Sequence, residues 1–204
     1  HRDLHSFPTR RSSDLAVAAK RQCITAPAVV ISDQAELQVL FERGELDRDC
    51  VVVARFQGPA ANGMPELHQL MPILGVLQDR GHAVALVTDG RLSGASGKVP
   101  AAIHVTPEAA KDGFIGRIQD GDVISLDVAA GELCVILDPR TLAERRHPDT
   151  PPAQNTVGRG LFKFSREVVT DAESGGCTLF EPLVTDDLPK GESVSHAAYD
   201  HCAS

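Results

Sequence analysis

Apolar runs of strand length recur along the first half of the chain, and a polar or glycine-rich stretch follows each run. The runs cover residues 28–31, 50–54 and 83–88. Nearly continuous apolar runs of this length are typical of strands that are covered on both faces. After the first run, Asp33 and Glu36 form a capping-box pattern. Apolar residues then recur at 37, 40 and 41 before Gly44. This pattern predicts a helix between the first two strands.

A second helix is predicted between the runs at 50–54 and 83–88. It would begin at the segment Met-Pro-Glu of residues 64–66, because Pro65 suits the first position of a helix. Pro72 is expected to break or kink this helix, which would resume over 73–77 and end at Gly81.

The second half of the chain shows shorter elements. Residues 115–138 have the pattern of a β-meander, with turns at 119–122 and 129–131. The other predictions are an extended stretch at 101–106, a helical turn at 107–111, a short helix at 139–146 and an amphipathic helix at 160–170. Together these elements predict a mixed α/β fold with a sizeable β component.

The two ends of the chain differ from its body. Residues 1–15 have no helical or strand period and resemble the translation of a sequencing adapter, so we expect them to be non-native. The alternative is a native tail that carries arginines. We expect one domain over residues 16–180, with a Pro-rich linker at 147–156. The polar, aperiodic residues 181–204 are expected to be disordered.

Composition narrows the possible classes of protein. The 204 residues suffice for a real hydrophobic core, and no apolar run approaches the roughly 20 residues that cross a bilayer, so we expect no membrane span. The chain carries 20 basic and 28 acidic residues, a formal net charge of −8. An acidic chain gains little from DNA phosphates, which argues against non-specific nucleic-acid binding.

Five cysteines lie far apart in the sequence, at 23, 50, 134, 177 and 202, and no pair has the spacing Cys-x-x-Cys. Such a set indicates reduced thiols in a cytoplasmic protein, and it does not form a zinc or iron–sulfur motif by itself. Cys50 and Cys134 each lie in an apolar run, so we expect both to be buried and inert.

Two glycine-rich loops, at 57–63 and 89–98, each follow a predicted buried strand, where α/β folds collect functional groups. The second loop holds Arg91, Ser93, Ser96 and Lys98. It matches neither a P-loop, a hydrolase elbow nor a dinucleotide-binding pattern. Its backbone N–H groups could hold an anion, but a solvated turn fits the same pattern.

Single residues leave several interpretations open. Glu66 is either a favourable carboxylate in the first turn of a helix or a ligand for Mg²⁺, and its spacing alone favours the structural role. His68 is only two residues away and would not share its helix face. His104 follows apolar residues and is expected in the core, and Asp89 is expected to cap its loop.

A joint pattern is more specific than any of these residues. Together, and in this order, five segments resemble the C-terminal part of the dihydroxy-acid and phosphogluconate dehydratase family: residues 46–53, 57–67, 87–100, 104–109 and 119–122. The resemblance covers about residues 24–180. Segments 62–66 and 90–100 favour the sugar-acid members, since the branched-chain members typically carry Phe after the arginine and a glycine pair after the serine.

The resemblance implies a fold and a reaction. The fold would be a swivelling β/β/α domain with a β-barrel-like sheet flanked by helices. The reaction would be dehydration of 6-phosphogluconate on the Entner–Doudoroff route. Glu66 matches the family's divalent-metal carboxylate, with Mg²⁺ as the expected ion, and Ser93 matches the base that takes the proton from C2. The C3 hydroxyl would leave toward an iron of an iron–sulfur cluster, and the enol would tautomerise to a 2-keto-3-deoxy acid. We expect Arg91, Ser96 and Lys98 to contact the substrate.

The resemblance also implies partners. In the family, the cluster cysteines and other metal ligands lie in an N-terminal domain that this sequence does not contain, so none of the five cysteines is assigned to a cluster. We therefore expect this chain to need that domain, to be inactive alone and to form a homodimer when complete. The alternatives are a dehydratase for unphosphorylated aldonic or branched-chain dihydroxy acids, or a non-catalytic anion-binding or assembly domain.

Overall fold

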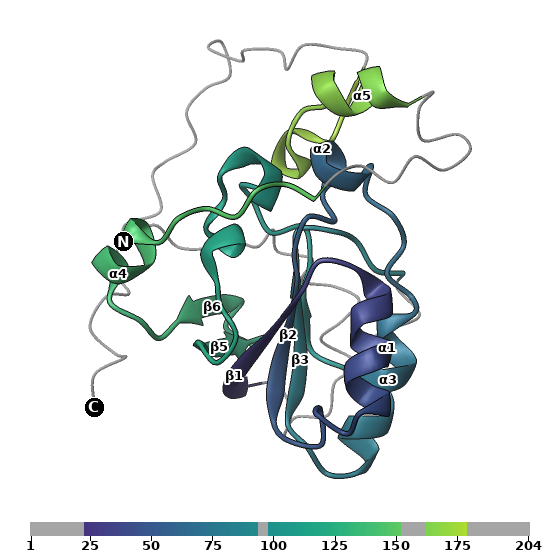
Figure 1. The fold of residues 1–204 in the computed structure, drawn as a ribbon, viewed down its shortest axis with the longest axis vertical. Coiled ribbons are helices and arrows are strands. Elements are labelled where there is room, and N and C mark those ends of the chain that lie inside the picture. Colours follow the sequence, from purple (N-terminus) through teal and green to yellow (C-terminus); the bar gives the residue numbers. More distant parts are fainter. Residues whose placement is uncertain (1–22, 94–97, 152–161, 179–204) are drawn as a thin grey trace.

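A computed structural model describes residues 23–93, 98–151 and 162–178 of the chain. Its centre is a six-stranded mixed sheet with the strand order β4-β3-β2-β1-β5-β6 (Figure 1). The strands are β1 (Cys23–Ile31), β2 (Cys50–Ala54), β3 (Val84–Thr88), β4 (Ala101–Ala102), β5 (Val123–Asp127) and β6 (Glu132–Val135). The three apolar runs of the sequence therefore become the three central parallel strands, as predicted.

The long strand β1 joins two parts of the sheet. Its second half, residues 28–31, pairs in parallel with β2, and β3 and β4 continue this parallel part. Its first half, residues 23–27, pairs antiparallel with β5, which pairs in turn with β6. Because the two partners lie along different halves of β1, the sheet curls into a half-barrel. The predicted mixed α/β fold with a barrel-like sheet is confirmed.

Helices α1 (Gln34–Glu42) and α3 (Leu70–Asp79) lie side by side on one face of the parallel strands (Figure 1). The carboxylate of Asp33 accepts the N–H of Ala35 at 2.8 Å and so caps α1 at the position that the sequence predicts. Leu37 of α1 and Leu74 of α3 are fully buried against Leu86 of β3 in one hydrophobic cluster.

The opposite face of the sheet packs on the second half of the chain. Here Val51 and Val53 of β2 share a cluster with Ile124 of β5 and with two 3₁₀ turns, η3 (Ala109–Lys111) and η4 (Phe114–Arg117). Short helices α4 (Pro139–Glu144) and α5 (Lys163–Val168) and the turn η5 (Ala172–Ser174) complete the described chain. The central strands β2 and β3 are thus buried on both faces, as their apolar sequences require.

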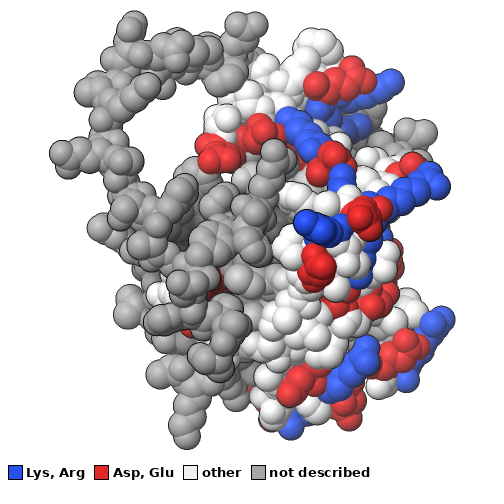
Figure 2. Space-filling model, turned by 90° about the vertical axis from the view of Figure 1, so that its left-hand side faces the viewer, with Lys and Arg blue, Asp and Glu red and all other residues white. Residues whose placement is uncertain are grey.

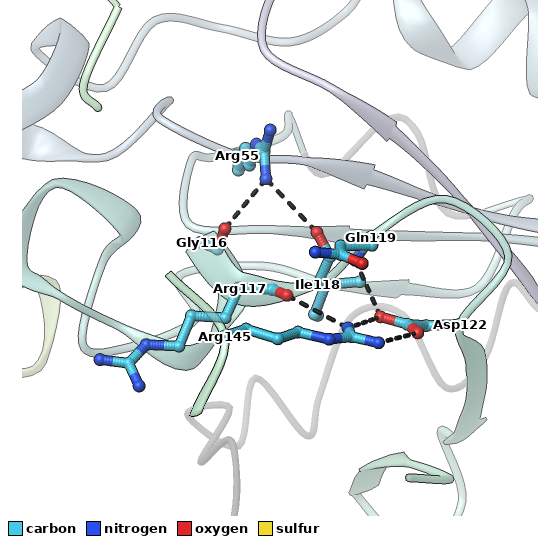
Figure 3. A network of polar contacts seen from close by, with 7 residues as sticks. All are labelled: Arg55, Gly116, Arg117, Ile118, Gln119, Asp122 and Arg145. Atoms are coloured by element: carbon cyan, nitrogen blue, oxygen red, sulfur yellow. Dashed lines mark hydrogen bonds and ion pairs between the residues drawn. The ribbon is translucent and has the colours of Figure 1, made fainter. Parts of the chain in front are cut away.

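Two arginines attach the loop before β5 to the rest of the domain (Figure 3). Arg55, which follows β2, donates to the carbonyls of Gly116 (2.9 Å) and Ile118 (3.3 Å). Arg145, after α4, forms a two-pronged ion pair with Asp122, in which Nη2 lies 2.9 Å from Oδ1. Both members of this pair are largely buried, so the contact fixes the loop more firmly than an exposed pair would.

Several sequence predictions are wrong in detail. Residues 64–69 are not helical: a short helix α2 (Pro59–Asn62) precedes them, and α3 begins only at Leu70. Pro72 does not break α3, because it stands in the first turn, where its missing N–H costs no hydrogen bond. Cys134 is exposed on β6, whereas Cys50 is buried, and burial raises the pKa of its thiol to about 11.

The later predictions hold only in part. Residues 115–117 form a 3₁₀ turn rather than a strand, and of 101–106 only Ala101–Ala102 pairs as a strand. The predicted helix at 160–170 is shorter, at Lys163–Val168, and residues 152–161 of the predicted linker and helix lie outside the described part. The predictions for 1–15 and 181–204 also lie outside it.

Charges of both signs are interspersed over the described part of the surface in Figure 2. None of the helices in residues 23–93, 98–151 and 162–178 is both long and apolar enough to cross a membrane.

Candidate active site

The candidate functional residues gather beyond the carboxyl ends of β2 and β3. The loop after β2 contains α2, and the loop after β3 begins at Asp89. In an open α/β sheet, ligands bind at this end of parallel strands, because neighbouring loops diverge there and leave their polar groups accessible.

Asp89 holds the two loops together. Its buried carboxylate accepts the backbone N–H groups of Phe56 (3.1 Å), Gln57 (2.8 Å) and Ala109 (2.9 Å). Burial raises the pKa of Asp89 to about 6, and the three hydrogen bonds oppose this shift. Asp89 therefore fixes segments from three parts of the chain, rather than capping its own loop as predicted.

Glu108 fixes the start of α2 in a similar way, through backbone N–H groups. Its buried carboxylate accepts the N–H groups of Ala60 (3.0 Å) and Ala61 (3.1 Å), and so satisfies two donors at the start of this helix. The residue just before α2 must be a glycine, Gly58, because a Cβ at this position would lie 2.3 Å from a carboxylate oxygen of Glu108. Glu108 thus fixes α2 and, with it, the start of the turn that leads to Glu66.

Glu66, Arg91 and Ser93 meet at one point. The Glu66 carboxylate accepts a hydrogen bond from the Arg91 guanidinium (2.8 Å) and another from the backbone N–H of Ser93 (2.6 Å). The two segments also form a short parallel bridge, in which the N–H of Leu67 donates to the carbonyl of Arg91 at 3.3 Å. This bridge explains why the chain around Glu66 does not continue as a helix, and a turn at residues 68–69 then leads into α3. Glu66 is therefore not a first-turn carboxylate, and the structural role that its spacing favoured is wrong.

The other predicted substrate contacts are placed differently. Lys98 forms an exposed ion pair with Asp79 at the end of α3 (2.5 Å). Ser96 lies in residues 94–97, outside the described part. The structure thus brings together Glu66, Arg91 and Ser93 of the five predicted site residues, and the contacts of these five with substrate stay predictions.

His104, which the sequence places in the core, is instead half-buried and lies next to the candidate site. It lies just after β4 with a positive φ of 57°, and its N–H donates to the carbonyl of Gly90 at 3.0 Å. Its half-buried ring lines a pocket of about 640 Å³, together with residues of α2 and α5. Burial lowers the pKa of His104, and the charge of Arg91 lowers it further. Both effects favour the neutral imidazole.

The described side chains fit the metals that the resemblance implies, Mg²⁺ and an iron–sulfur cluster, only in part. Among the described residues, no group of three or more His, Cys, Asp and Glu side chains could hold a metal ion. The Glu66 carboxylate suits a hard divalent ion as one ligand of several, because each of its oxygens can accept more than one contact. The described cysteines offer no cluster site: Cys50 is buried in the core, and Cys23 and Cys134 are exposed on strands.

These features define an α/β domain that presents an acid, an arginine and a serine at the ends of parallel strands. The family model for the C-terminal domain of dihydroxy-acid/6-phosphogluconate dehydratases matches residues 13–176. The chain therefore belongs to the dihydroxy-acid/6-phosphogluconate dehydratase family.

Curated relatives agree with this assignment. The phosphogluconate dehydratase of Pseudomonas aeruginosa is 54% identical over 169 residues, which are 82% of this chain and 28% of the relative. That of Escherichia coli K12 is 54% identical over 168 residues, 81% of this chain and 28% of the relative. A dihydroxy-acid dehydratase of Wolinella succinogenes is 34% identical over 162 residues, 78% of this chain and 28% of the relative. The chain thus spans little more than a quarter of the length of these relatives.

Proposed function

We propose that this chain is the C-terminal part of a hydro-lyase that removes water from 6-phosphogluconate and yields 2-dehydro-3-deoxy-6-phosphogluconate. The observation that carries the proposal is the direct contact between Glu66 and Ser93, which joins the two positions expected to do the chemistry. The identity of 54% to two phosphogluconate dehydratases supports this substrate over a branched-chain dihydroxy acid, since the dihydroxy-acid relative is only 34% identical.

In this proposal Ser93 acts as the base. Ser93 is exposed, and its backbone N–H is held by Glu66, so its main chain is fixed beside the carboxylate. In the proposed reaction Ser93 Oγ takes the proton from C2, and the C3 hydroxyl leaves with the electron pair of its C–O bond. The enol that forms tautomerises to the 2-keto acid, and the net product besides it is one water. A serine hydroxyl can do this only where positive charge stabilises its alkoxide.

Glu66 and Arg91 supply part of that environment. The guanidinium of Arg91 orients the Glu66 carboxylate and donates through Nε to the carbonyl of Met64 at 2.9 Å. Glu66 would provide one oxygen ligand to Mg²⁺ beside Ser93. When bound, a divalent ion and an iron–sulfur cluster supply Lewis acidity for the alkoxide and the departing hydroxyl. We propose that the other ligands come from the N-terminal domain that completes this enzyme, that the complete enzyme is a cytoplasmic homodimer, and that it acts in the Entner–Doudoroff route.

The test is the substrate range of the complete protein, purified without oxygen. We expect it to dehydrate 6-phosphogluconate with a kcat/KM at least tenfold above that for unphosphorylated gluconate or for a branched-chain dihydroxy acid. A preference for either of the latter would overturn the proposed substrate. The 204-residue chain alone is the matched control, and it should show no turnover.

A further inference from the structure

A pocket adjoins the Glu66–Arg91–Ser93 site and is not used by the proton transfer described above. It has a volume of about 640 Å³ and lies between the turn after α2 and the segment 162–178. Figure 1 shows α5 and the chain after it beside α2, far along the sequence from the rest of the site. The polar residues of its lining include Asn62, His104, Ser165 and Arg166.

The pocket shares a wall with the proposed catalytic residues. Met64 lines the pocket, and its carbonyl accepts the Nε–H of Arg91. His104 also lines it and is bonded through its N–H to Gly90, three residues before Ser93. Two residues of the pocket lining are thus hydrogen-bonded to the segment 90–93, which puts the pocket next to the site expected to hold C2.

The segment that carries Arg166 is fixed to the domain. Lys111 of η3 donates to the carbonyl of Val169 (3.0 Å) and forms an ion pair with Asp171 (2.9 Å). The N–H of Thr170 donates to the carbonyl of Cys177 at 3.0 Å, and the N–H of Cys177 donates back to the Thr170 hydroxyl at 2.9 Å. The pocket wall is thus held by specific contacts and not by chain continuity alone.

Arg166 is a half-buried cation beside a left-handed turn. Its Cδ would lie 3.9 Å from a Cβ at Gly63, which has a φ of +67°, so its side chain runs along this turn. No described residue that lines the pocket is acidic. The pocket therefore combines one guanidinium and a few neutral hydrogen-bonding groups with a largely apolar lining that includes Phe162 and Val169. A guanidinium among neutral donors is a suitable ligand for a phosphate monoester.

We infer that this pocket binds the phosphate end of the sugar acid and that Arg166 is its phosphate ligand. The inference rests on the proposed function, because it takes Ser93 as the position of C2. It also differs from the sequence-based expectation, in which Lys98 and Arg91 were the cations near the substrate. Lys98 pairs with Asp79 outside this pocket, Arg91 pairs with Glu66, and Arg166 is among the residues that line the pocket.

The test measures binding of inorganic phosphate, 6-phosphogluconate and gluconate to the complete protein by calorimetry, with wild type, Arg166→Gln and Arg166→Lys. We expect Arg166→Gln to weaken binding of inorganic phosphate and 6-phosphogluconate by 10- to 100-fold and to change gluconate binding less than threefold. This range corresponds to loss of one charge-assisted contact of about 1.5–3 kcal/mol. Arg166→Lys should lose less, because it keeps the charge but not the two-pronged geometry.

The matched control is Lys163→Gln, which removes an exposed cation from the same helix, outside the pocket. It should leave all three affinities unchanged. Equal losses for 6-phosphogluconate and gluconate in Arg166→Gln would assign Arg166 to the common carboxylate end, and unchanged affinities would remove it from the site. Either result overturns the inference. Failure of the wild-type protein to dehydrate 6-phosphogluconate would instead overturn the proposed function, so the two failures are distinguishable.

Discussion

The backbone N–H of Ser93 donates to a carboxylate oxygen of Glu66 across 2.6 Å, although 27 positions separate the two residues in the chain. The expected base and the expected metal ligand are therefore positioned by the same contact. Any displacement of the segment around Glu66 is passed directly to the serine. A substitution that moves one of these two residues is therefore expected to move the other.

Replacing Ser93 by alanine should abolish turnover of 6-phosphogluconate by the complete protein. Loss of a general base lowers the rate by about 10²–10⁴-fold, while the backbone N–H that bonds to Glu66 is retained. Substrate affinity should therefore stay within a few-fold of wild type. Steady-state kinetics and calorimetry check both parts. A kcat above a tenth of the wild-type value would exclude Ser93 as the base.

Replacing Glu66 by glutamine should raise the Mg²⁺ concentration needed for half-maximal activity by at least tenfold. The amide keeps the size of the side chain, but it removes the charge that a hard cation prefers. The ion pair with Arg91 is partly exposed, so the free energy of unfolding should change by less than about 1 kcal/mol.

The matched control for Glu66 is Glu45→Gln, which removes a carboxylate from an exposed pair with Arg43. It should alter neither the metal requirement nor the stability. A large fall in the thermal midpoint of Glu66→Gln, with an unchanged metal requirement, would make Glu66 a structural residue only.

Replacing Asp89 by asparagine should lower the free energy of unfolding by about 2 kcal/mol or more. An amide has one acceptor oxygen and one NH₂ donor, so it cannot accept all three N–H groups that the carboxylate accepts, and at least one buried donor is left unpaired. Urea unfolding of the chain measures the change. Asp79→Asn, at an exposed aspartate, should shift stability by less than about 0.5 kcal/mol. Similar shifts for both variants would remove Asp89 as the anchor of the loops.

The Arg145–Asp122 pair should make stability depend on pH in the acid range. Hydrogen bonding to Arg145 lowers the pKa of Asp122 in the folded state. A carboxylate with a lowered pKa stabilises the fold above its unfolded pKa of about 3.9, and this stabilisation is lost as the pH falls through the folded pKa. Arg145→Gln should therefore destabilise the chain at pH 7 and at pH 5, and the difference from wild type should shrink below pH 4.

Urea midpoints at pH 7, 5 and 3 measure this dependence. Arg146→Gln is the matched control, because Arg146 is exposed and pairs with an exposed Asp149 three residues on, so its effect should be small at each pH. A deficit for Arg145→Gln that is the same at all three pH values would show that the guanidinium stabilises the loop through its other contacts and not through Asp122.

The central part of the fold could be predicted from the sequence because its signals are local. The apolar run 50–54 becomes a fully buried parallel strand, and Asp33 caps α1, since burial on two faces and helix capping each leave a short, recognisable pattern. The segment 64–69 could not be predicted in this way. Pro65 and Glu66 suit the start of a helix, but pairing with Arg91, 25 residues further along, holds them extended.

The pocket had no local signal either. His104 and Arg166 are separated by 62 positions, and only the folding of segment 162–178 onto α2 brings both to one cavity. Cys134 shows the same limit on a smaller scale. It lies in an apolar run, but side chains alternate between the two faces of a strand, and in β6 Leu133 is buried whereas Cys134 lies on the exposed face. Apolar sequence alone does not say which face is covered.

Strands β2 and β5 pair with different halves of β1, and this arrangement has a consequence for truncated versions of the domain. If the hairpin of β5 and β6 were removed, residues 23–27 would keep a row of backbone donors and acceptors with no strand beside them. An unpaired edge of this kind recruits strands from other molecules. The hairpin therefore protects this edge as well as contributing to the core, and a variant that lacks residues 123–135 should precipitate more readily than the full chain although Glu66, Arg91 and Ser93 are all still present.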